Sequence, residues 1–302
     1  MTKMTKQEMH KKVANKVIEQ MKTHGTDWVK PWTTKGLGDQ HIATSMSTGN
    51  AYQGINTLIL GIEKAVNGYT TGQWATYQQW KKRDAQVRKG QKGTTVVFYK
   101  KVQIKDKASD DPNAKVTIPL MKFFTVFNAD QVDGYELPVY EDVERREPQT
   151  VANELTIDVG AELRSNAGDS AFYSPNEDFI NMPLIEQFSD DSLYASTLLH
   201  ELGHWTGHKS RLDRNLKNGF GTKDYAFEEL VAELTSAMLC GSLNVDPEPR
   251  PDHAKYLNGW IEKLKDKPET IFKACALAQS ASDYLLDLQA QKVQQTKIKQ
   301  AA

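Results

Sequence analysis

Hydrophobic positions in the first quarter of the chain follow the spacing of amphipathic helices. Between residues 5 and 23, apolar side chains recur every three or four positions, which predicts a helix with one buried face. A loop rich in Gly and Trp follows over residues 25–54, and helices are expected over residues 55–66 and 73–83. An Asn-Gly and a Thr-Gly dipeptide separate these two helices, as is typical of helix boundaries.

The pattern then changes to one typical of strands. Residues 94–102 and 116–127 are rich in β-branched and aromatic side chains, and the segment between them is polar. These two runs predict a β-hairpin with a long loop. Helices followed by strands indicate an α+β domain, to which we assign residues 1–133.

The second half of the chain predicts a mostly helical domain. Residues 134–150 are polar, contain two prolines and are expected to form a linker. The second domain, residues 151–290, should contain a small sheet, and the Gln/Lys-rich residues 291–302 a disordered tail. Its expected elements are a helix over 151–166, extended pieces at 171–174 and 178–182, a helix capped by Asp190 or Asp191 that ends near Gly207, a helix capped by Asp224 that ends near 243, and two helices between 252 and 289.

Composition supports a globular protein with two domains, each with its own core. The chain has 302 residues, of which 39% are hydrophobic and 25% charged. No apolar run reaches the roughly 18 residues that span a bilayer, and the lysine-rich start has no apolar core of a secretory signal, so we expect a cytoplasmic protein without membrane contact. The two cysteines, Cys240 and Cys275, lie in apolar helical patterns and are expected to be buried thiols, so a metal ion would need His, Asp or Glu ligands.

Charge divides the chain into a basic and an acidic half. Residues 1–128 hold 21 Lys and Arg against 9 Asp and Glu, whereas residues 129–302 hold 17 against 30. Aromatic rings interleaved with cations favour binding of single-stranded nucleic acid, because bases stack on rings while cations follow the phosphates. The alternatives are a solvated lysine-rich surface and aromatic side chains that pack into the core. The candidate DNA-binding residues are Trp74, Tyr77, Trp80, Lys81, Lys82, Arg83, Arg88, Lys89 and Lys92.

Residues 200–204 read His-Glu-Leu-Gly-His and carry the chemistry that identifies a reaction. On a helix, His200 and His204 project from one face and reach a single metal ion, while Glu201 is placed to act as a general base on a water molecule. The alternative is an amphipathic helix that carries two histidines by coincidence.

A catalytic zinc site needs a third protein ligand. His208 lies at the wrong offset for the metzincin signature and is left as a residue at the rim of the site. Glu229 and Glu233 share one flank of the following predicted helix, from which Glu228 is expected to point away. We therefore predict that Glu229 binds the metal and that Glu233 accepts a hydrogen bond from a ligating histidine, as in a gluzincin. A solvated acidic helix face is the alternative.

These residues imply metal-assisted hydrolysis of a peptide bond. Tyr173, His208 and Tyr225 are candidates to stabilise the oxyanion. The extended segment 178–182 is either an edge strand that pairs with an extended substrate or a buried core strand.

Several long motifs resemble ArdC-type antirestriction proteins. They are residues 52–56 (YQGIN), 86–99 (QVRKGQKGTTVVFY), 126–132 (VFNADQV), 200–208 (HELGHWTGH) and 228–233 (EELVAE). The resemblance covers about residues 8–290 and implies an N-terminal domain that binds single-stranded DNA, joined to a zincin-like metallopeptidase domain. It further implies carriage by a plasmid or phage and protection of incoming DNA from host restriction.

The resemblance assigns His200 and His204 to the metal, Glu201 to the general base and Glu229 to the third ligand. The expected cofactor is Zn²⁺, with Mn²⁺ or Co²⁺ as alternatives. The expected partners are single-stranded DNA and a host protein substrate. Two other functions stay open: a DNA-coating protein whose metal site is structural or inactive, and an accessory protein of plasmid replication.

Overall fold

The described part of the first half combines α-helices and short 3₁₀ helices with two small sheets. The computed structural model describes residues 5–32, 42–105, 108–109, 111, 113–138, 146–166, 168–216, 222–246 and 254–301. The elements of this half are α1 (Lys6–His24), η1 (Gly25–Trp32), β1 (Thr44–Ser45), α2 (Ile55–Asn67), β2 (Gln73–Thr76), α3 (Tyr77–Lys81), β3 (Gln86–Val87), β4 (Thr94–Lys105), β5 (Lys115–Asn128), η3 (Ala129–Gln131) and β6 (Val132–Asp133).

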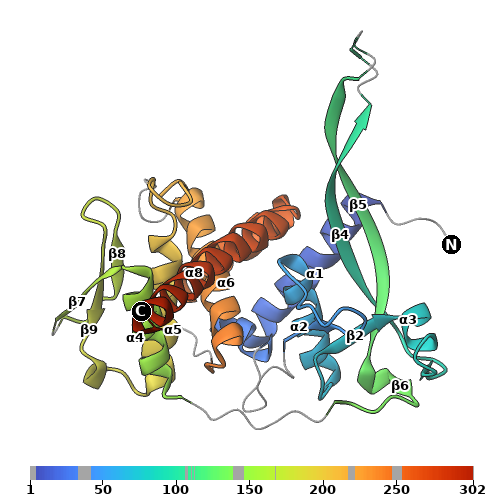
Figure 1. Ribbon diagram of the computed structural model, residues 1–302, viewed down its shortest axis with the longest axis horizontal. Helices are drawn as coiled ribbons and strands as arrows, with labels where there is room; N and C mark the ends of the chain where they lie inside the picture. The colour runs from blue at the N-terminus through green and yellow to red at the C-terminus, as the bar shows by residue number, and fades with distance from the viewer. Residues whose placement is uncertain are drawn as a thin grey trace.

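The second half is mostly helical and carries a small sheet. Its elements are α4 (Pro148–Val159), β7 (Glu162–Asn166), β8 (Phe172–Ser174), β9 (Phe179–Pro183), η4 (Ile185–Gln187), α5 (Asp191–Trp205), α6 (Lys223–Leu243), α7 (Ala254–Asp266) and α8 (Thr270–Ala301). Figure 1 shows the two halves side by side, with α8 crossing the second half and its first turn lying near α1. The predicted α+β architecture is confirmed.

The first helix forms where the apolar spacing predicts it. Thr5 caps α1 through a reciprocal pair of hydrogen bonds: its hydroxyl accepts from the Glu8 amide at 3.2 Å, and its own amide donates to the Glu8 carboxylate at 2.7 Å. Met9, Val13 and Val17 lie on the buried face. The helix is therefore held at its start by the cap and along its length by apolar burial.

The hairpin is the longest sheet element and extends away from the body of the protein (Figure 1). β4 and β5 pair antiparallel from Thr94 opposite Val126 to Lys105 opposite Lys115. They belong to a sheet of strand order β1-β2-β5-β4. The predicted hairpin is confirmed.

The predicted helix over residues 73–83 is wrong in its first turn. Residues Gln73–Thr76 form β2, which pairs with β5, and only Tyr77–Lys81 are helical. Thr76 explains the change, because its hydroxyl caps the amide of Gln79 and so begins the helix there. The three-residue aromatic spacing that indicated one helix therefore spans a strand and a helix.

Two boundaries in the second half also differ from those predicted. The helix expected to reach residue 166 ends at Val159, where Gly160 adopts a left-handed conformation with φ of 76°, and residues 162–166 pair with β9. Thr222, not Asp224, caps α6, whereas Asp190 caps α5 as predicted. Part of the predicted linker, residues 139–145, lies outside the described residues.

The predicted disordered tail is helical up to Ala301. Residues 291–300 continue α8 with exposed side chains. Gln, Lys and Ala favour helix, and no Gly or Pro interrupts this segment, so an established helix continues through it although its side chains are exposed.

The largest hydrophobic core joins the two halves. It packs Val17 of α1 and Leu58 of α2 against Leu230 of α6, Trp260 of α7 and Ile271 of α8, all at most 1% exposed. A second cluster lies within the second half, between α4, α5 and the small sheet. The expectation of a separate core for each domain is therefore wrong for the largest cluster, because α1 and α2 bury their apolar faces against the second half.

Among the described helices, none combines the length and the apolar character that a transmembrane helix requires.

Candidate metal centre

Helices α5 and α6 position the site by packing closely against each other. Gly203, within the HExxH sequence, lies at their contact, where a Cβ atom would come within 3.2 Å of Ala232 Cα and 3.3 Å of Thr235 Cβ. A larger residue would push the helices apart. Asp190 holds the start of α5 by accepting from the Leu193 amide at 2.9 Å. The small residues at this contact therefore bring carboxylates of α6 next to histidines of α5.

The predicted ligands meet in a small triangle of donor atoms. His200 Nε2 lies 3.1 Å from His204 Nε2 and 3.6 Å from Glu229 Oε2, and His204 Nε2 lies 3.5 Å from Glu229 Oε1. Metal–ligand bonds of about 2.05 Å in a tetrahedron separate ligand atoms by about 3.3 Å. The triangle therefore fits a divalent cation bound by two imidazoles and one carboxylate. Within the part of the chain that the structure describes, these three residues form the cluster suited to a metal ion.

The outer nitrogens of both histidines face carboxylates. His200 Nδ1 lies 3.5 Å from Glu233 Oε2, and the predicted hydrogen bond between these two side chains stays a prediction. His204 Nδ1 lies 3.3 Å from Glu228 Oε1, so the expectation that Glu228 points away is wrong. Such partners orient ligating imidazoles and raise their basicity.

Arg214 explains why Glu228 faces the site. Its guanidinium donates to Glu228 Oε1 at 2.8 Å, to the Gly203 carbonyl at 2.6 Å and to the Thr206 hydroxyl at 2.7 Å. The turn after α5 therefore closes over the start of α6 and draws the Glu228 side chain toward His204. A helical wheel of α6 alone cannot predict this contact, because Arg214 lies outside α6.

The histidines and carboxylates at the triangle shift each other's pKa values. Burial lowers the pKa of the His204 imidazole, but hydrogen bonds and attraction from Glu228, Glu229 and Glu201 outweigh burial and raise it to about 10. Burial raises the pKa of Glu229, whereas His200 and His204 hold it well below its ordinary range. A cation must displace the proton of the His204 imidazole, so its affinity rises with pH.

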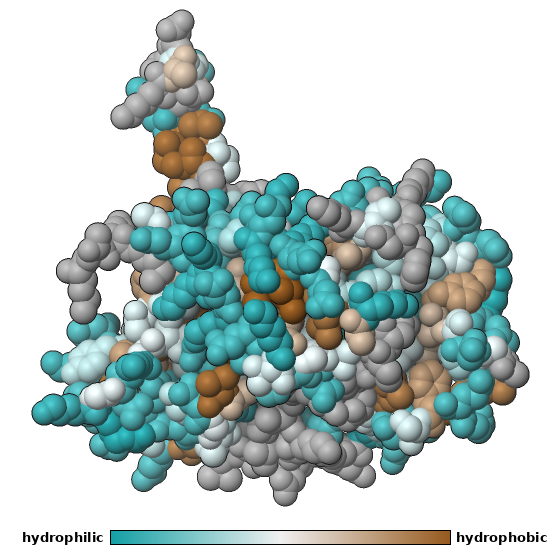
Figure 2. Space-filling view, turned by 180° about the vertical axis from the view of Figure 1, so that it is seen from behind, coloured by the Kyte–Doolittle hydropathy of each residue, from teal (hydrophilic) through white to brown (hydrophobic). Residues whose placement is uncertain are grey.

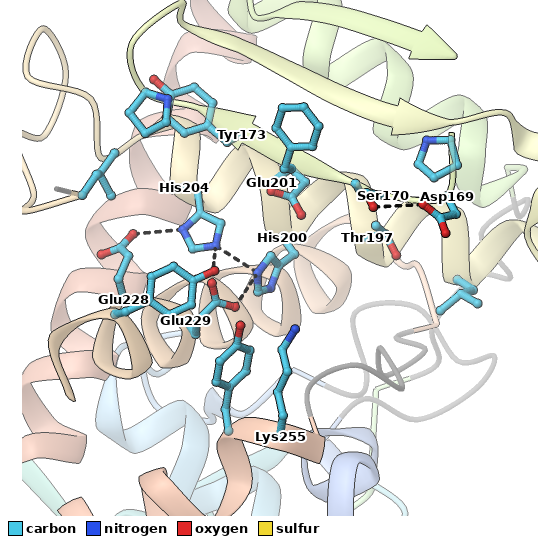
Figure 3. A pocket seen from close by; sticks show the side chains of 18 of the residues that line it. Asp169, Ser170, Tyr173, Thr197, His200, Glu201, His204, Glu228, Glu229 and Lys255 are labelled. Carbon is cyan, nitrogen blue, oxygen red and sulfur yellow. Dashed lines mark hydrogen bonds and ion pairs between the residues drawn. The ribbon is translucent and has the colours of Figure 1, made fainter. Parts of the chain in front are cut away.

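A cavity of about 810 Å³ opens onto the triangle. Figure 3 shows His200, His204 and Glu229 converging on one point, with Glu201 on the neighbouring wall and Tyr173 above it. Lys255 enters from α7, an element that the sequence pattern does not connect with the site. The apolar face of α7 gives no signal that its first turn reaches the cavity.

The strand that borders the cavity is β8. In the small sheet of order β7-β9-β8, β9 is central and all five of its residues are buried, so residues 178–182 are the core strand and not a docking edge. β8 is the edge strand, and its residues Phe172 and Tyr173 line the cavity. The run of hydrophobic residues in β9 is what predicts the buried alternative.

The three oxyanion candidates lie in different surroundings. The Tyr173 hydroxyl donates to Asp178 at 2.7 Å and accepts from Arg211 at 3.0 Å, so it is already engaged. His208 lies in the turn after α5, where its Nδ1 is 2.7 Å from the Ser210 hydroxyl. Tyr225 lines the cavity, and burial followed by the charge of Glu229 raises its pKa, which keeps the hydroxyl protonated. The Tyr225 hydroxyl is also hydrogen-bonded, to Glu229 and Tyr256. Tyr173 and Tyr225 both line the cavity, and the role of either hydroxyl at the oxyanion stays a prediction.

The predicted DNA-binding residues fall into a buried group and an exposed group. Trp74 and Trp80 are 0% exposed, and the Trp80 indole donates to the Phe127 carbonyl, so the prediction that these two rings stack on bases is wrong. They fill the core because residues 73–76 are a strand of the sheet. Tyr77 is 41% exposed. The remaining predicted residues are exposed cations: Lys81, Lys82, Arg83, Arg88, Lys89 and Lys92.

Comparison with known protein families assigns both halves. Residues 7–127 match the model for the N-terminal domain of the anti-restriction factor ArdC, and residues 150–277 match a zincin-like metallopeptidase model. An uncharacterized protein, y4eC, of Sinorhizobium fredii is 37% identical over 94% of this chain and 93% of its own length. Two DNA primases TraC of Escherichia coli are each 38% identical, and the chain spans 20% and 29% of their lengths.

Two solved structures share the whole fold. The metal-free crystal structure of the antirestriction protein ArdC from plasmid R388 superposes with a TM-score of 0.78 at 36% identity, covering 94% of this chain and 98% of that one. The Mn(II)-bound structure of that protein gives a TM-score of 0.77 at 37% identity, covering 93% and 98%. The chain therefore belongs to the ArdC family of antirestriction proteins.

Proposed function

We propose that this protein hydrolyses peptide bonds at the α5–α6 site and binds single-stranded DNA through its basic half, and that it thereby protects incoming DNA of a mobile element from restriction. The observation that carries the enzymatic part is the triangle of His200, His204 and Glu229 beside Glu201 in an open cavity. Its donor atoms match a cation in spacing and in chemistry.

His200, His204 and Glu229 hold the metal in this proposal. Zn²⁺ suits two imidazoles and a carboxylate in a tetrahedron, and Mn²⁺ or Co²⁺ are alternatives because oxygen and imidazole ligands bind these ions as well. Glu228 accepts a hydrogen bond from His204 Nδ1, and the Glu233 carboxylate lies 3.5 Å from His200 Nδ1, so the two carboxylates orient the imidazole rings. A bound divalent cation lowers the pKa of water and polarises a peptide carbonyl.

Glu201 acts as the general base. It takes the proton of the attacking water and delivers it to the leaving amine, so one carboxylate serves both halves of the reaction. The Tyr225 hydroxyl, kept protonated by its raised pKa, donates to the oxyanion that develops at the carbonyl oxygen.

The open edge of β8 positions the substrate. An extended peptide that pairs with Phe172–Ser174 would pass along the cavity in front of the triangle. Recognition through main-chain hydrogen bonds favours an extended segment of a protein as the substrate. In this proposal that protein is a host protein, such as a component of a restriction system.

The basic half supports the DNA-binding part. The cations at positions 81–83, 88, 89 and 92 are exposed, and residues 1–128 carry a net charge of +12. Such a surface attracts phosphates without sequence preference.

A Glu201→Gln variant tests the enzymatic part. It should keep the metal, because Glu201 is not one of the three ligands, and lose about 10²- to 10⁴-fold in peptide hydrolysis. Protection of a plasmid from restriction during transfer is measured beside hydrolysis. Undiminished protection by a variant that keeps its metal but no longer hydrolyses peptides would show that protection does not use peptidase chemistry.

A further inference from the structure

The outer part of the β4–β5 hairpin has two uncovered faces among the described residues, whereas near its base Val97, Met121 and Phe123 pack against the core that joins the two halves. β2 pairs with β5 only from Val126 to Asn128, so beyond Val126 the described sheet consists of β4 and β5 alone. This part projects from the body as an arm (Figure 1). A two-stranded ribbon of this kind has little burial of its own and exposes its side chains to solvent.

One face of the arm carries apolar side chains. Residues directly opposite each other in an antiparallel pair share a face, and the pairings Phe98↔Lys122, Val96↔Phe124 and Ile104↔Val116 place these side chains on the same side. We call this side the aromatic face; its exposed apolar members are Phe98, Ile104, Val116, Ile118 and Phe124, between 37% and 45% exposed. Figure 2 shows hydrophobic side chains gathered along the projecting arm. An exposed row of apolar side chains favours aggregation or marks a binding site.

Two aromatic rings lie on the aromatic face near the base of the arm. The rings of Phe98 and Phe124 lie edge to face, with centroids 6.2 Å apart and planes at 84°. Both rings, with Tyr77, line a groove of about 1610 Å³ between the base of the arm and the start of α8. Their exposed surfaces are therefore accessible to a flat ligand.

The charge of the arm indicates what the partner is. β4 and β5 together contain five lysines and no Asp or Glu. Lys122, opposite Phe98, and Lys100, opposite Leu120, lie on the aromatic face itself and are exposed. An apolar protein surface that covered this face would bury both ammonium groups, which is costly without an anion.

We propose that single-stranded DNA binds along the aromatic face, with bases stacked on Phe98 and Phe124 and phosphates paired with Lys100 and Lys122. The proposal rests on the proposed DNA-binding function and places the strand on the arm and its groove, whereas Trp74 and Trp80 are in the core. Exposed rings alternating with cations along an extended surface are the combination that binds a single strand through stacking and phosphate contacts. A duplex hides the base faces that these rings require.

The test compares the arm with the basic patch that the sequence suggested. Binding of a fluorescein-labelled oligothymidylate is measured by anisotropy over a range of salt concentrations for the full chain. A Phe98→Leu/Phe124→Leu variant keeps the apolar character and removes stacking, and we expect affinity to fall roughly 5- to 150-fold for each ring that stacks. Phe98→Tyr should retain affinity, and circular dichroism checks the fold of each variant.

The cations are tested by two matched pairs. A Lys100→Gln/Lys122→Gln variant should reduce the salt dependence, by about 0.7 in the logarithmic slope for each phosphate that the protein no longer neutralises. A Lys81→Gln/Lys82→Gln variant removes the same charge from the patch at α3 and should have the smaller effect.

The outcomes of these measurements distinguish the proposed position of the strand on the arm from DNA binding itself. If the wild type binds but the leucine pair binds equally well, the strand does not follow the aromatic face and the proposal is overturned, while DNA binding stands. If the leucine pair instead changes the mass in sedimentation and not the affinity, the face joins copies of the chain, which also overturns the proposal. If the wild type binds no single-stranded DNA, the DNA-binding function itself is wrong.

Discussion

Removing Arg214 from its ion pair with Glu228, beside the metal triangle, should destabilise the protein strongly, because it leaves a buried carboxylate without this partner. The two side chains are 5% and 11% exposed, and their contact is 2.8 Å. Replacing Arg214 with Gln leaves the Glu228 carboxylate buried with His204 as its remaining charged neighbour, and it also removes the bonds to Gly203 and Thr206. Breaking a buried pair from one side typically costs about 3–5 kcal/mol.

We expect the destabilisation in Arg214→Gln to lie near the lower end of that range, at about 3 kcal/mol, because Gln can keep one hydrogen bond and His204 offsets part of the charge. The free energy of unfolding is measured by urea denaturation in the presence of a chelator, so that metal binding does not add to it. The denaturant slope should be unchanged.

The matched control is Arg146→Gln. Arg146 also pairs with a glutamate, Glu154, but the two side chains are 55% and 47% exposed. Water screens such a pair, so its removal should cost at most about 1 kcal/mol. Equal destabilisation of the two variants would refute the reasoning, because burial would then not determine the contribution of the pair.

Two further predictions concern stability. In Gly93→Ala a Cβ atom would lie 2.3 Å from Thr125 Cγ2 and 2.9 Å from the Phe127 ring, so the free energy of unfolding should fall by about 1–3 kcal/mol. In Gly241→Ala, on α6, the added Cβ atom meets open space, so the free energy of unfolding should rise by up to about 1 kcal/mol. Thermal denaturation of both variants checks these opposite signs. Burial lowers the pKa of Lys64 to about 8, below its unfolded value of 10.5, so the folded state binds fewer protons between these values and stability should rise with pH from about 8 to 10.5. A Lys64→Met variant should lack this rise, and equal pH slopes in urea denaturation of the two proteins would contradict the assignment.

The ligand triangle could be predicted from the sequence because it depends on residue spacing within single helices and on small residues where the two helices pack. His200 and His204 are four residues apart on one helix, and Glu229 lies on the next helix beside small residues that allow close packing. The position of Glu228 could not be predicted in this way. It depends on Arg214, which arrives from the turn after α5 and whose contacts a helical wheel does not contain.

The DNA-binding prediction failed at its two tryptophans for a related reason. Trp74, Tyr77 and Trp80 have a spacing that fits one helix, but Trp74 lies on a strand and Trp80 on a helix, and both fill cores of the first half. Spacing cannot separate a short strand followed by a short helix from a single helix. The exposed rings of Phe98 and Phe124 went unassigned because strand alternation alone does not reveal that no further strand of the described chain covers the arm.

The central claim is that His200, His204 and Glu229 together bind one divalent cation. The most direct test is the metal content of the purified protein, measured by inductively coupled plasma mass spectrometry beside His204→Ala and Glu229→Gln after equal exposure to Zn²⁺. The structure predicts one ion per chain in the wild type and a loss of bound metal in both variants, because each removes one corner of the triangle. Wild-type metal content in both variants would contradict the claim.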